Sequence, residues 1–360
     1  MTQDIRQFPG FDTIRVIAAA AVVFSHSFLL AEGFETNEPV AKHTGTVLGV
    51  YAVLVFLILS GFLVTDSAER SKSFLQYASK RLRRIAPGFI FNVLFVTVFL
   101  CAIFAVDRGV DFLSRSATWL NVFKVLTFQE PGLYFPDVWF YTPTPGQDTA
   151  LPSVANGVLW TIRLEAACYL IVGLLMVTRL LTKASALVLL LASFGLAFAY
   201  DWQVIRLLTD FFFVFPSFMV GVVFQKFAGH HQAHGGIALG SLIALVVLSL
   251  VLPVWPWALA ALFPVLAVYP LVWAGQRDWF ALRWLHRHGD PSYGMYLWGW
   301  PIQQVTRAIV GPGWSGFGFA LLTIPLTWLA GVISWKYIEA PMLGRNRSAR
   351  RKEADTDGSA

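Results

Sequence analysis

The stretch FDTIRVIAAAAVVFSHSF, Phe11–Phe28, is nearly apolar from Ile14 onward, yet it contains Asp12, Arg15 and His26. Arg15 and His26 are eleven residues apart, close to three helical turns, so both lie on one helix face, roughly 16 Å apart along the axis. Ionisable groups in a membrane span are costly and face a protein interior or a wet cavity. The stretch therefore predicts a membrane-spanning helix with a functional site. Two structural alternatives stay open: Arg15 as an anchor at the membrane edge, and His26 in a helix–helix hydrogen bond.

The composition extends this prediction to the whole chain. Of its 360 residues, 56% are hydrophobic and only 13% are charged, whereas soluble domains carry about a quarter charged residues. We therefore expect an all-α, polytopic membrane protein in contact with lipid. The net charge of +6 fits basic cytoplasmic loops and is weak support for nucleic acid, so no nucleic-acid partner is predicted. The two cysteines, Cys101 and Cys168, lie in apolar runs and offer neither a disulfide framework nor metal spacing, so no metal is predicted.

About ten apolar runs are long enough, or nearly so, to cross the hydrocarbon core as helices. No internal repeat stands out among them. The runs are Thr13–Leu30, Val47–Thr65, Gly88–Val106, Gly157–Val177, Ala184–Tyr200, Leu207–Phe224, Ile237–Leu252, Trp255–Trp273, Ser292–Val310 and Phe317–Tyr337.

The charges between these runs predict the orientation. If the N-terminus is cytoplasmic, the inner segments hold 18 Lys and Arg residues and the outer loops hold five, so both termini are expected in the cytoplasm. The tail, residues 343–360, is highly charged and expected to be disordered. The longest outer loop, Asp107–Asn156, is rich in aromatic residues, Pro and Gly, which favours a folded loop over an outer cavity.

A basic cluster, KRLRRIAP at Lys80–Pro87, lies on the inner side between the second and third runs. Pro87 is expected in the first turn of the third span. Arginines bind phosphate bidentately and a helix N-terminus adds a favourable dipole, so the cluster suits an anionic ligand. Ordinary positive-inside charge is the alternative. Asp12, three residues before Arg15, is expected to fix that arginine rather than take part in chemistry.

Polar residues recur in three later runs. Glu165 lies about two turns into the fourth run, where a carboxylate needs a partner or a proton, and an internal ion pair is the alternative. Ser60 and Gly61 interrupt an apolar helix, which is also typical of close packing between small residues. The segment Ser292–Gln304 mixes Tyr, Trp and Gln, and an aromatic interfacial belt explains only part of it.

Taken in order, these motifs resemble the acyltransferase 3 family of integral-membrane O-acyltransferases, over about Phe8–Met342. The resemblance implies a transmembrane domain over residues 8–342 with ten spans, a cytoplasmic acyl-CoA donor (usually acetyl-CoA) and a catalytic His26. It also implies that the Arg83/Arg84 motif holds the donor. The matching elements are Arg15 and His26 with ten residues between them, SGF at Ser60–Phe62, RRIAP at Arg83–Pro87, NGVLWTIRLE at Asn156–Glu165, SYGMYLWGWP at Ser292–Pro301 and IEAP at Ile338–Pro341.

The same resemblance implies a bacterial inner-membrane enzyme that acylates a hydroxyl of a carbohydrate or lipid-linked glycan. Gly299 is a departure, because many relatives have a histidine at this place in the motif. The chain ends soon after the tenth run, so the esterase-like domain fused to some relatives is not expected. The expected site residues are His26 and Glu165 for catalysis, Arg15, Arg83, Arg84 and Ser60 for the donor, and Trp160, Tyr293 and Tyr296 for the substrate.

In the mechanism we expect, the donor phosphates bind the inner arginines and the thioester lies near His26, which takes the proton of the attacking hydroxyl. Glu165 either orients the imidazole or binds the acceptor. The other class of function is a secondary transporter with His26 and Glu165 as a proton relay. The acceptor sugar, the acyl group, the oligomeric state and the choice between direct transfer and an acyl-histidine intermediate stay open.

Overall fold

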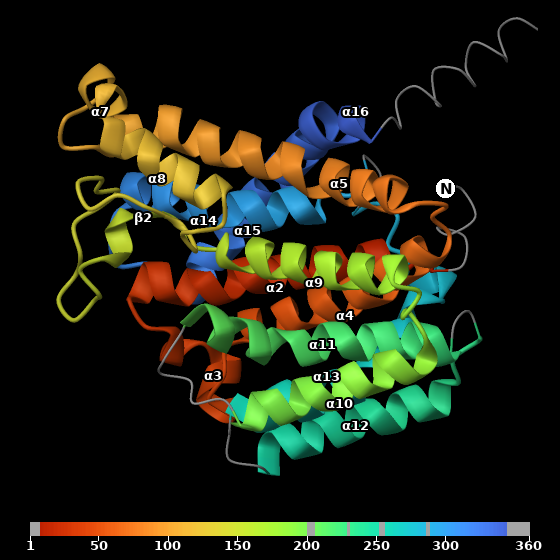
Figure 1. The fold of residues 1–360 in the computed structure, drawn as a ribbon. Coiled ribbons are helices and arrows are strands. Elements are labelled where there is room, and N and C mark those ends of the chain that lie inside the picture. Colours follow the sequence, from red (N-terminus) through yellow and green to blue (C-terminus); the bar gives the residue numbers. More distant parts are fainter. Residues whose placement is uncertain (1–7, 200–205, 229–230, 252–255, 286–288, 344–360) are drawn as a thin grey trace, which may run out of the picture.

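Long helices packed side by side form the protein in a computed structural model (Figure 1), which describes residues 8–199, 206–228, 231–251, 256–285 and 289–343. Two of the long helices contain a π-helical turn, at Val96–Cys101 and Trp335–Glu339. The helices are α2 (Phe11–Glu32), α4 (Leu48–Glu69), α5 (Phe74–Phe95) continuing into α6 (Ala102–Phe104), α9 (Trp160–Val177), α10 (Lys183–Ala199), α11 (Arg206–Ala228), α12 (Gly235–Val251), α13 (Pro256–Gly275), α14 (Ser292–Val310) and α15 (Gly316–Ser334) continuing into α16 (Ala340–Met342).

Each of the ten predicted runs overlaps a helix in the described part of the chain. Six of these helices are long and apolar enough to cross a membrane by length and composition, so the protein is a multi-pass membrane protein. Ten crossings and cytoplasmic termini stay predictions, and residues 344–360 of the expected tail lie outside the described residues. The six are Phe11–Glu32, Leu48–Glu69, Phe74–Phe104, Trp160–Val177, Leu207–Ala228 and Gly316–Met342.

The placement of Pro87 in the first turn of a span was wrong. Helix α5 begins at Phe74, where the Ser73 hydroxyl accepts a hydrogen bond from the Gln76 backbone N–H. This cap and the helix-favouring residues after it start the helix more than three turns before Pro87. The basic cluster Lys80–Arg84 is therefore displayed along a helix surface rather than at a helix N-terminus.

The bundle has two unlike ends (Figure 1). At one end, the basic face, Phe8, Arg70, Lys80 and Leu343 line a single cavity. At the opposite end, the loop face, lie the short elements at the left of Figure 1. These are α3 (Pro39–Thr44), α7 (Val110–Ser114), α8 (Ser116–Leu126) and the antiparallel pair β1 (Leu133–Tyr134) and β2 (Val154–Asn156).

The loop face is attached to the bundle by a buried polar contact. Pro301 inside α14 has no N–H, so the carbonyl of Leu297, four residues earlier, loses its partner within the helix. The side-chain amides of Asn92 and Asn156 both donate to that carbonyl, at 3.2 and 3.0 Å. Asn156 also donates to Asn92, and both side chains are fully buried. The long segment Asp107–Asn156 is therefore a folded structure joined to α5 and α14.

We expect the basic face to lie in the cytoplasm, because of the 18-to-5 distribution of Lys and Arg. A fluorescent reporter fused to the C-terminus should be active, and a reporter that works only in the periplasm should be inactive there. Fusion after Arg108, on the loop face, is the matched control and should give the opposite pattern. Periplasmic activity at the C-terminus would contradict this orientation.

Candidate active site

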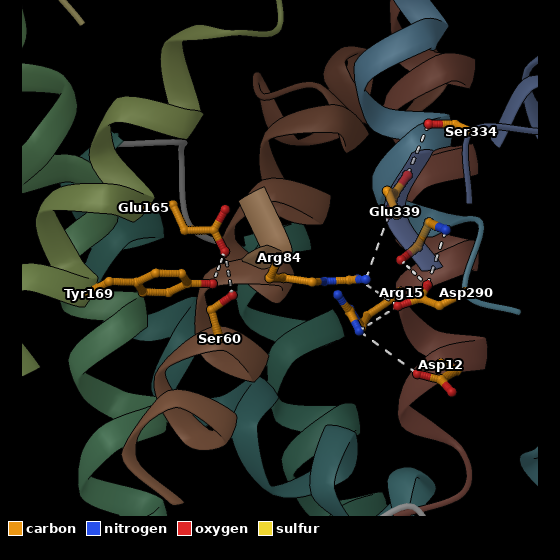
Figure 2. A network of polar contacts seen from close by, with 10 residues as sticks. Asp12, Arg15, Ser60, Arg84, Glu165, Tyr169, Asp290, Ser334 and Glu339 are labelled. Atoms are coloured by element: carbon orange, nitrogen blue, oxygen red, sulfur yellow. Dashed lines mark hydrogen bonds and ion pairs between the residues drawn. The ribbon is translucent and has the colours of Figure 1, made fainter. Parts of the chain in front are cut away.

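A buried carboxylate organises the basic face (Figure 2). Asp290 Oδ2 accepts hydrogen bonds from Arg15 Nη1 at 2.9 Å and from Arg84 Nη2 at 2.6 Å. Its other oxygen accepts from the Ser292 backbone N–H at 3.1 Å and from the Ser292 hydroxyl at 2.5 Å, at the first turn of α14. One side chain thus caps α14 and holds an arginine from each of α2 and α5.

The charge of Asp290 depends on these two arginines. The residue lies before α14, outside the predicted spans, and its side chain is 6% exposed. Burial alone would raise the pKa of Asp290, but the guanidinium groups of Arg15 and Arg84 outweigh it and hold the pKa below the usual range of an aspartate. Asp290 is therefore an anion at neutral pH.

Further acids hold the same arginines. Asp12 lies 3.8 Å from Arg15, as predicted for a residue that fixes it. Glu339 lies 3.7 Å from Arg84 and accepts a hydrogen bond from Ser334 at 3.0 Å. The π-helical turn after α15 carries Glu339, and the guanidinium of Arg84 also lies 5.5 Å from the Trp335 ring. Arg84 is thus fixed from two sides before any ligand binds.

A cavity of about 470 Å³ at the basic face has cationic walls. Lys80 donates to Ser71 at 3.0 Å and Arg81 donates to Ser67 at 3.2 Å, and among the described residues neither forms an ion pair. These two cations are therefore available to an anionic ligand. The charged residues of the wall are Arg15, Arg70, Lys80, Arg81 and Arg84, with Asp12 and Asp290 as the acids.

A chamber of about 70 Å³ continues from this cavity into the bundle. The two spaces have four wall residues in common, Arg15, Ser60, Arg84 and Tyr169, which form the boundary between them. Glu165 accepts hydrogen bonds from Ser60 at 3.0 Å and from the Tyr169 hydroxyl (Figure 2). Glu165 thereby fixes one side of the boundary, opposite the two arginines.

Two tyrosines of α14 line the chamber, each with its hydroxyl bonded. Tyr293 donates to the Ile85 carbonyl at 2.8 Å. The Tyr296 hydroxyl lies 3.0 Å from the Val158 carbonyl and 2.6 Å from the Thr161 hydroxyl. These bonds connect α14 to α5 and α9 and hold the aromatic rings in place.

His26 lies beyond the chamber, toward the loop face. It is half-buried, and its ring meets Trp300 edge to face, with 4.9 Å between ring centroids. Trp300 follows Tyr296 by four residues, so His26 is about one helical turn past the chamber along α14. Gln303 Nε2 donates to the Val23 carbonyl and the Ser27 hydroxyl, both at 2.8 Å. Helix α14 therefore braces the turn of α2 that carries His26.

Gly299 lies where α14 approaches α2. A Cβ atom added at Gly299 would come 2.9 Å from Val23 Cγ2. A histidine at this place would therefore require the Val23 side chain to shift, one turn before His26 on α2.

Comparison with known proteins now adds to this geometry. The acyltransferase domain model Acyl_transf_3 matches residues 8–335, nearly all of the described bundle. The chain belongs to the acyltransferase 3 family.

Three relatives illustrate the family. The chain is 26% identical over 348 residues to an O-acetyl transferase of Shigella phage Sf6, with 93% of this chain and 96% of the relative covered. It is 27% identical over 364 residues to Nodulation protein 10 of Rhizobium leguminosarum bv. viciae, covering 93% of each. It is 21% identical over 391 residues to peptidoglycan O-acetyltransferase OatA of Listeria monocytogenes serovar 1/2a, covering 93% of this chain and 55% of the relative. No solved structure matches the chain.

The protein is therefore a membrane acyltransferase. These comparisons do not support the alternative of a secondary transporter. Among the described residues, no group of three or more His, Cys, Asp or Glu side chains could hold a metal ion.

The acyltransferase 3 motifs do not all meet at one point. The cavity and chamber bring together six of the residues selected from the sequence. His26 is separate, and no hydrogen bond joins it to Glu165. Arg83 is exposed and Trp160 is half-buried, and neither belongs to the walls of the two spaces. The six are Arg15, Ser60, Arg84, Glu165, Tyr293 and Tyr296.

Sequence reasoning did not single out Asp290, Glu339 or Tyr169, and it included Lys80 and Arg81 only as members of the basic cluster. A signal for Asp290 was present, since an acid directly before Pro-Ser is typical of a helix start. This helix start was also predicted at the inner membrane edge, where the arginines were expected. Glu339 belongs to the IEAP motif, which was matched to the family without a role being assigned to it.

Proposed function

We propose that this acyltransferase moves an acetyl group from cytoplasmic acetyl-CoA to a hydroxyl of a carbohydrate or lipid-linked glycan at the bacterial inner membrane, with His26 as general base. The observation that supports it best is the path formed by the cationic cavity and the chamber, which points from the basic face toward His26. Acetyl-CoA has phosphates at one end and a thioester at the other, and the path is likewise most cationic at the basic face.

The donor phosphates would bind in the wide cavity. Lys80 and Arg81 carry no carboxylate partner in the described part of the chain, whereas Arg84 already contacts Asp290 and Glu339. Charge-assisted hydrogen bonds from Lys80 and Arg81 therefore suit the phosphates. Arg15 and Arg84 would border the pantetheine arm at the boundary of the chamber, opposite Ser60 and Tyr169.

The chemical step would take place between the chamber and His26. The acceptor hydroxyl oxygen attacks the thioester carbonyl carbon, the C–S bond breaks, and coenzyme A leaves as its thiol after the proton from the hydroxyl has passed through the imidazole of His26. Histidine suits this role because its ordinary pKa range lies near neutral pH. Trp300 and Gln303 would position α2 for this step.

Glu165 is assigned a positioning role in this proposal. Its carboxylate holds Ser60 and Tyr169 at the boundary, and the arrangement favours this role over orientation of the imidazole. The acceptor assignment draws on relatives, one of which is named a peptidoglycan O-acetyltransferase.

The proposal predicts transfer of label from radiolabelled acetyl-CoA to a glycan or glycolipid fraction when membranes containing the protein are incubated with it. Membranes with His26→Ala should leave that fraction unlabelled. Uptake of an unmodified solute without acyl transfer would favour a transporter and overturn the proposal.

Replacing Lys80 or Arg81 with Ala should raise the KM for acetyl-CoA about tenfold, because each loses a charge-assisted bond to phosphate. Arg81→Lys should restore only part of this, since lysine lacks the bidentate geometry. Arg83→Ala is the matched control on the same helix and should leave KM unchanged. The measurement is initial rate against acetyl-CoA concentration. If only Arg83→Ala raises the KM for acetyl-CoA, Arg83 binds the donor, as first predicted from the sequence.

A further inference from the structure

We propose that the chamber holds the acyl group and that Phe56 and Tyr296 limit that group to acetyl. This inference rests on the proposed function, since it assumes an acyl-CoA whose arm enters through the boundary of Ser60, Tyr169, Arg15 and Arg84. It adds a physical reason for acyl selectivity and names the residues that set it.

The first argument is size. A protein cavity of about 150 Å³ accommodates benzene, which has six heavy atoms. The chamber, at about 70 Å³, is roughly half as large and suits the three heavy atoms of an acetyl group. A longer acyl chain would meet the side chains that close the chamber.

The second argument is that the walls of the chamber change from polar at the boundary to apolar farther inside. The boundary is polar, with Ser60 and Glu165 on one side and two arginines on the other. Away from the boundary, the α4 wall is apolar, through Val53 and Phe56. An acetyl group in the chamber would therefore rest its methyl group against this apolar wall.

The third argument is that the wall formed by Tyr293 and Tyr296 is held in place by its contacts. Moving the Tyr296 ring would break its contacts with Thr161 and the Val158 carbonyl and leave buried polar groups unpaired, which is costly. Tyr293 is fixed as well, because its ring lies close against Gly88, where an added Cβ would be 2.8 Å away. The chamber cannot enlarge on this side to admit a longer chain.

Phe56 is a wall residue that can be replaced by a smaller one without loss of a side-chain hydrogen bond. Its ring meets Tyr296 edge to face, with 5.9 Å between centroids, and it also packs against the small cluster of Val16, Ala19 and Met295. Replacing Phe56 with a smaller residue enlarges the chamber while Tyr296 keeps its partners.

The experiment compares acetyl-, propionyl- and butyryl-CoA as donors for the full-length enzyme in membranes. One methylene in a fitted apolar pocket changes kcat/KM by about 10–200-fold, so the wild type should prefer acetyl over propionyl at least about tenfold. Phe56→Ala should raise the propionyl-to-acetyl ratio of kcat/KM at least about tenfold, and Phe56→Leu should raise it less. Phe62→Ala is the control, since Phe62 lies on the same helix, is buried, packs on Phe8 and Phe11, and is absent from the chamber wall.

Each outcome decides one of the two proposals. The chamber assignment is overturned, while acyl transfer stands, if the wild type has the same kcat/KM for butyryl-CoA and acetyl-CoA. It is also overturned if Phe56→Ala and Phe56→Leu transfer acetyl with an unchanged donor preference. If the wild type transfers no acyl group from any of the three donors, the proposed function itself fails. If Phe56→Ala does not accumulate in the membrane, Phe56→Leu decides alone.

Discussion

Replacing His26 with Ala is expected to lower kcat by about 10²–10⁴-fold, because a positioned general base contributes that much to rate. The KM for acetyl-CoA should change little. The proposed phosphate ligands Lys80 and Arg81 line the same cavity as Arg15, which is roughly 16 Å from His26 along α2. Both kcat and KM should be measured on the same membrane preparation. A fall in kcat alone indicates a lost base, whereas a rise in KM indicates a lost binding site.

His26→Gln makes the test sharper. Glutamine keeps much of the shape and hydrogen-bonding capacity of histidine but cannot carry the proton, so this variant should fail as well. His43→Gln, on α3 at the loop face, is the matched control and should keep full activity. An active His26→Gln enzyme would give His26 a purely structural role, as a residue that packs on Trp300.

A related measurement separates direct transfer from an acyl-histidine intermediate. We expect direct transfer, so incubation with labelled acetyl-CoA and no acceptor should leave His26 unlabelled. Label trapped on the peptide that contains His26 would instead show a covalent intermediate.

The second large effect is expected at Asp290. Asp290→Ala should destabilise the protein by about 3 kcal/mol, because removing one member of a buried ion pair leaves uncompensated charge. Arg15 and Arg84 would keep only the longer contacts to Asp12, 3.8 Å, and Glu339, 3.7 Å. The apparent unfolding temperature in detergent should therefore fall clearly. Asp278→Ala is the control, since its contact with Arg283 is exposed and such pairs contribute little.

The pH dependence at Asp290 follows from its lowered pKa. A carboxylate whose pKa is lower in the folded state stabilises that state fully above the pKa of the unfolded chain, about 3.9, and the effect is lost as pH falls toward the folded pKa. The difference in unfolding temperature between wild type and Asp290→Asn should therefore be the same at pH 7 and pH 5 and shrink only below about pH 4. A difference that disappears by pH 5 would contradict the two-arginine arrangement.

Much of the bundle could be predicted from local sequence. The apolar run Ser292–Val310 coincides with α14, because Asp290, Pro291 and Gly311 mark its two ends. The start of α5 was misplaced because amphipathic, basic residues extend a helix beyond its apolar part. Hydropathy alone does not register that extension.

The site was only partly predictable, for two different reasons. Arg83 and Arg84 were treated as a pair, although adjacent helical residues point about 100° apart, and here only Arg84 faces the cavity. The helical period alone predicts this difference between the two residues. The contact of Asp290 with Arg15 spans 275 positions in the chain and depends on how α2, α5 and α14 pack together, which no local pattern encodes.

The carbonyl of Leu297 that Pro301 leaves unpaired has a consequence for the membrane as an electrical barrier. Asn92 and Asn156 donate to that carbonyl, and all three residues are fully buried, so no backbone polar group is left unpaired where α5, α14 and the loop face meet. A membrane enzyme with a wide donor cavity at one face must keep the rest of its interior closed to protons and ions. An unpaired carbonyl at this junction would attract buried water, a route for protons, and the two amides satisfy it without water.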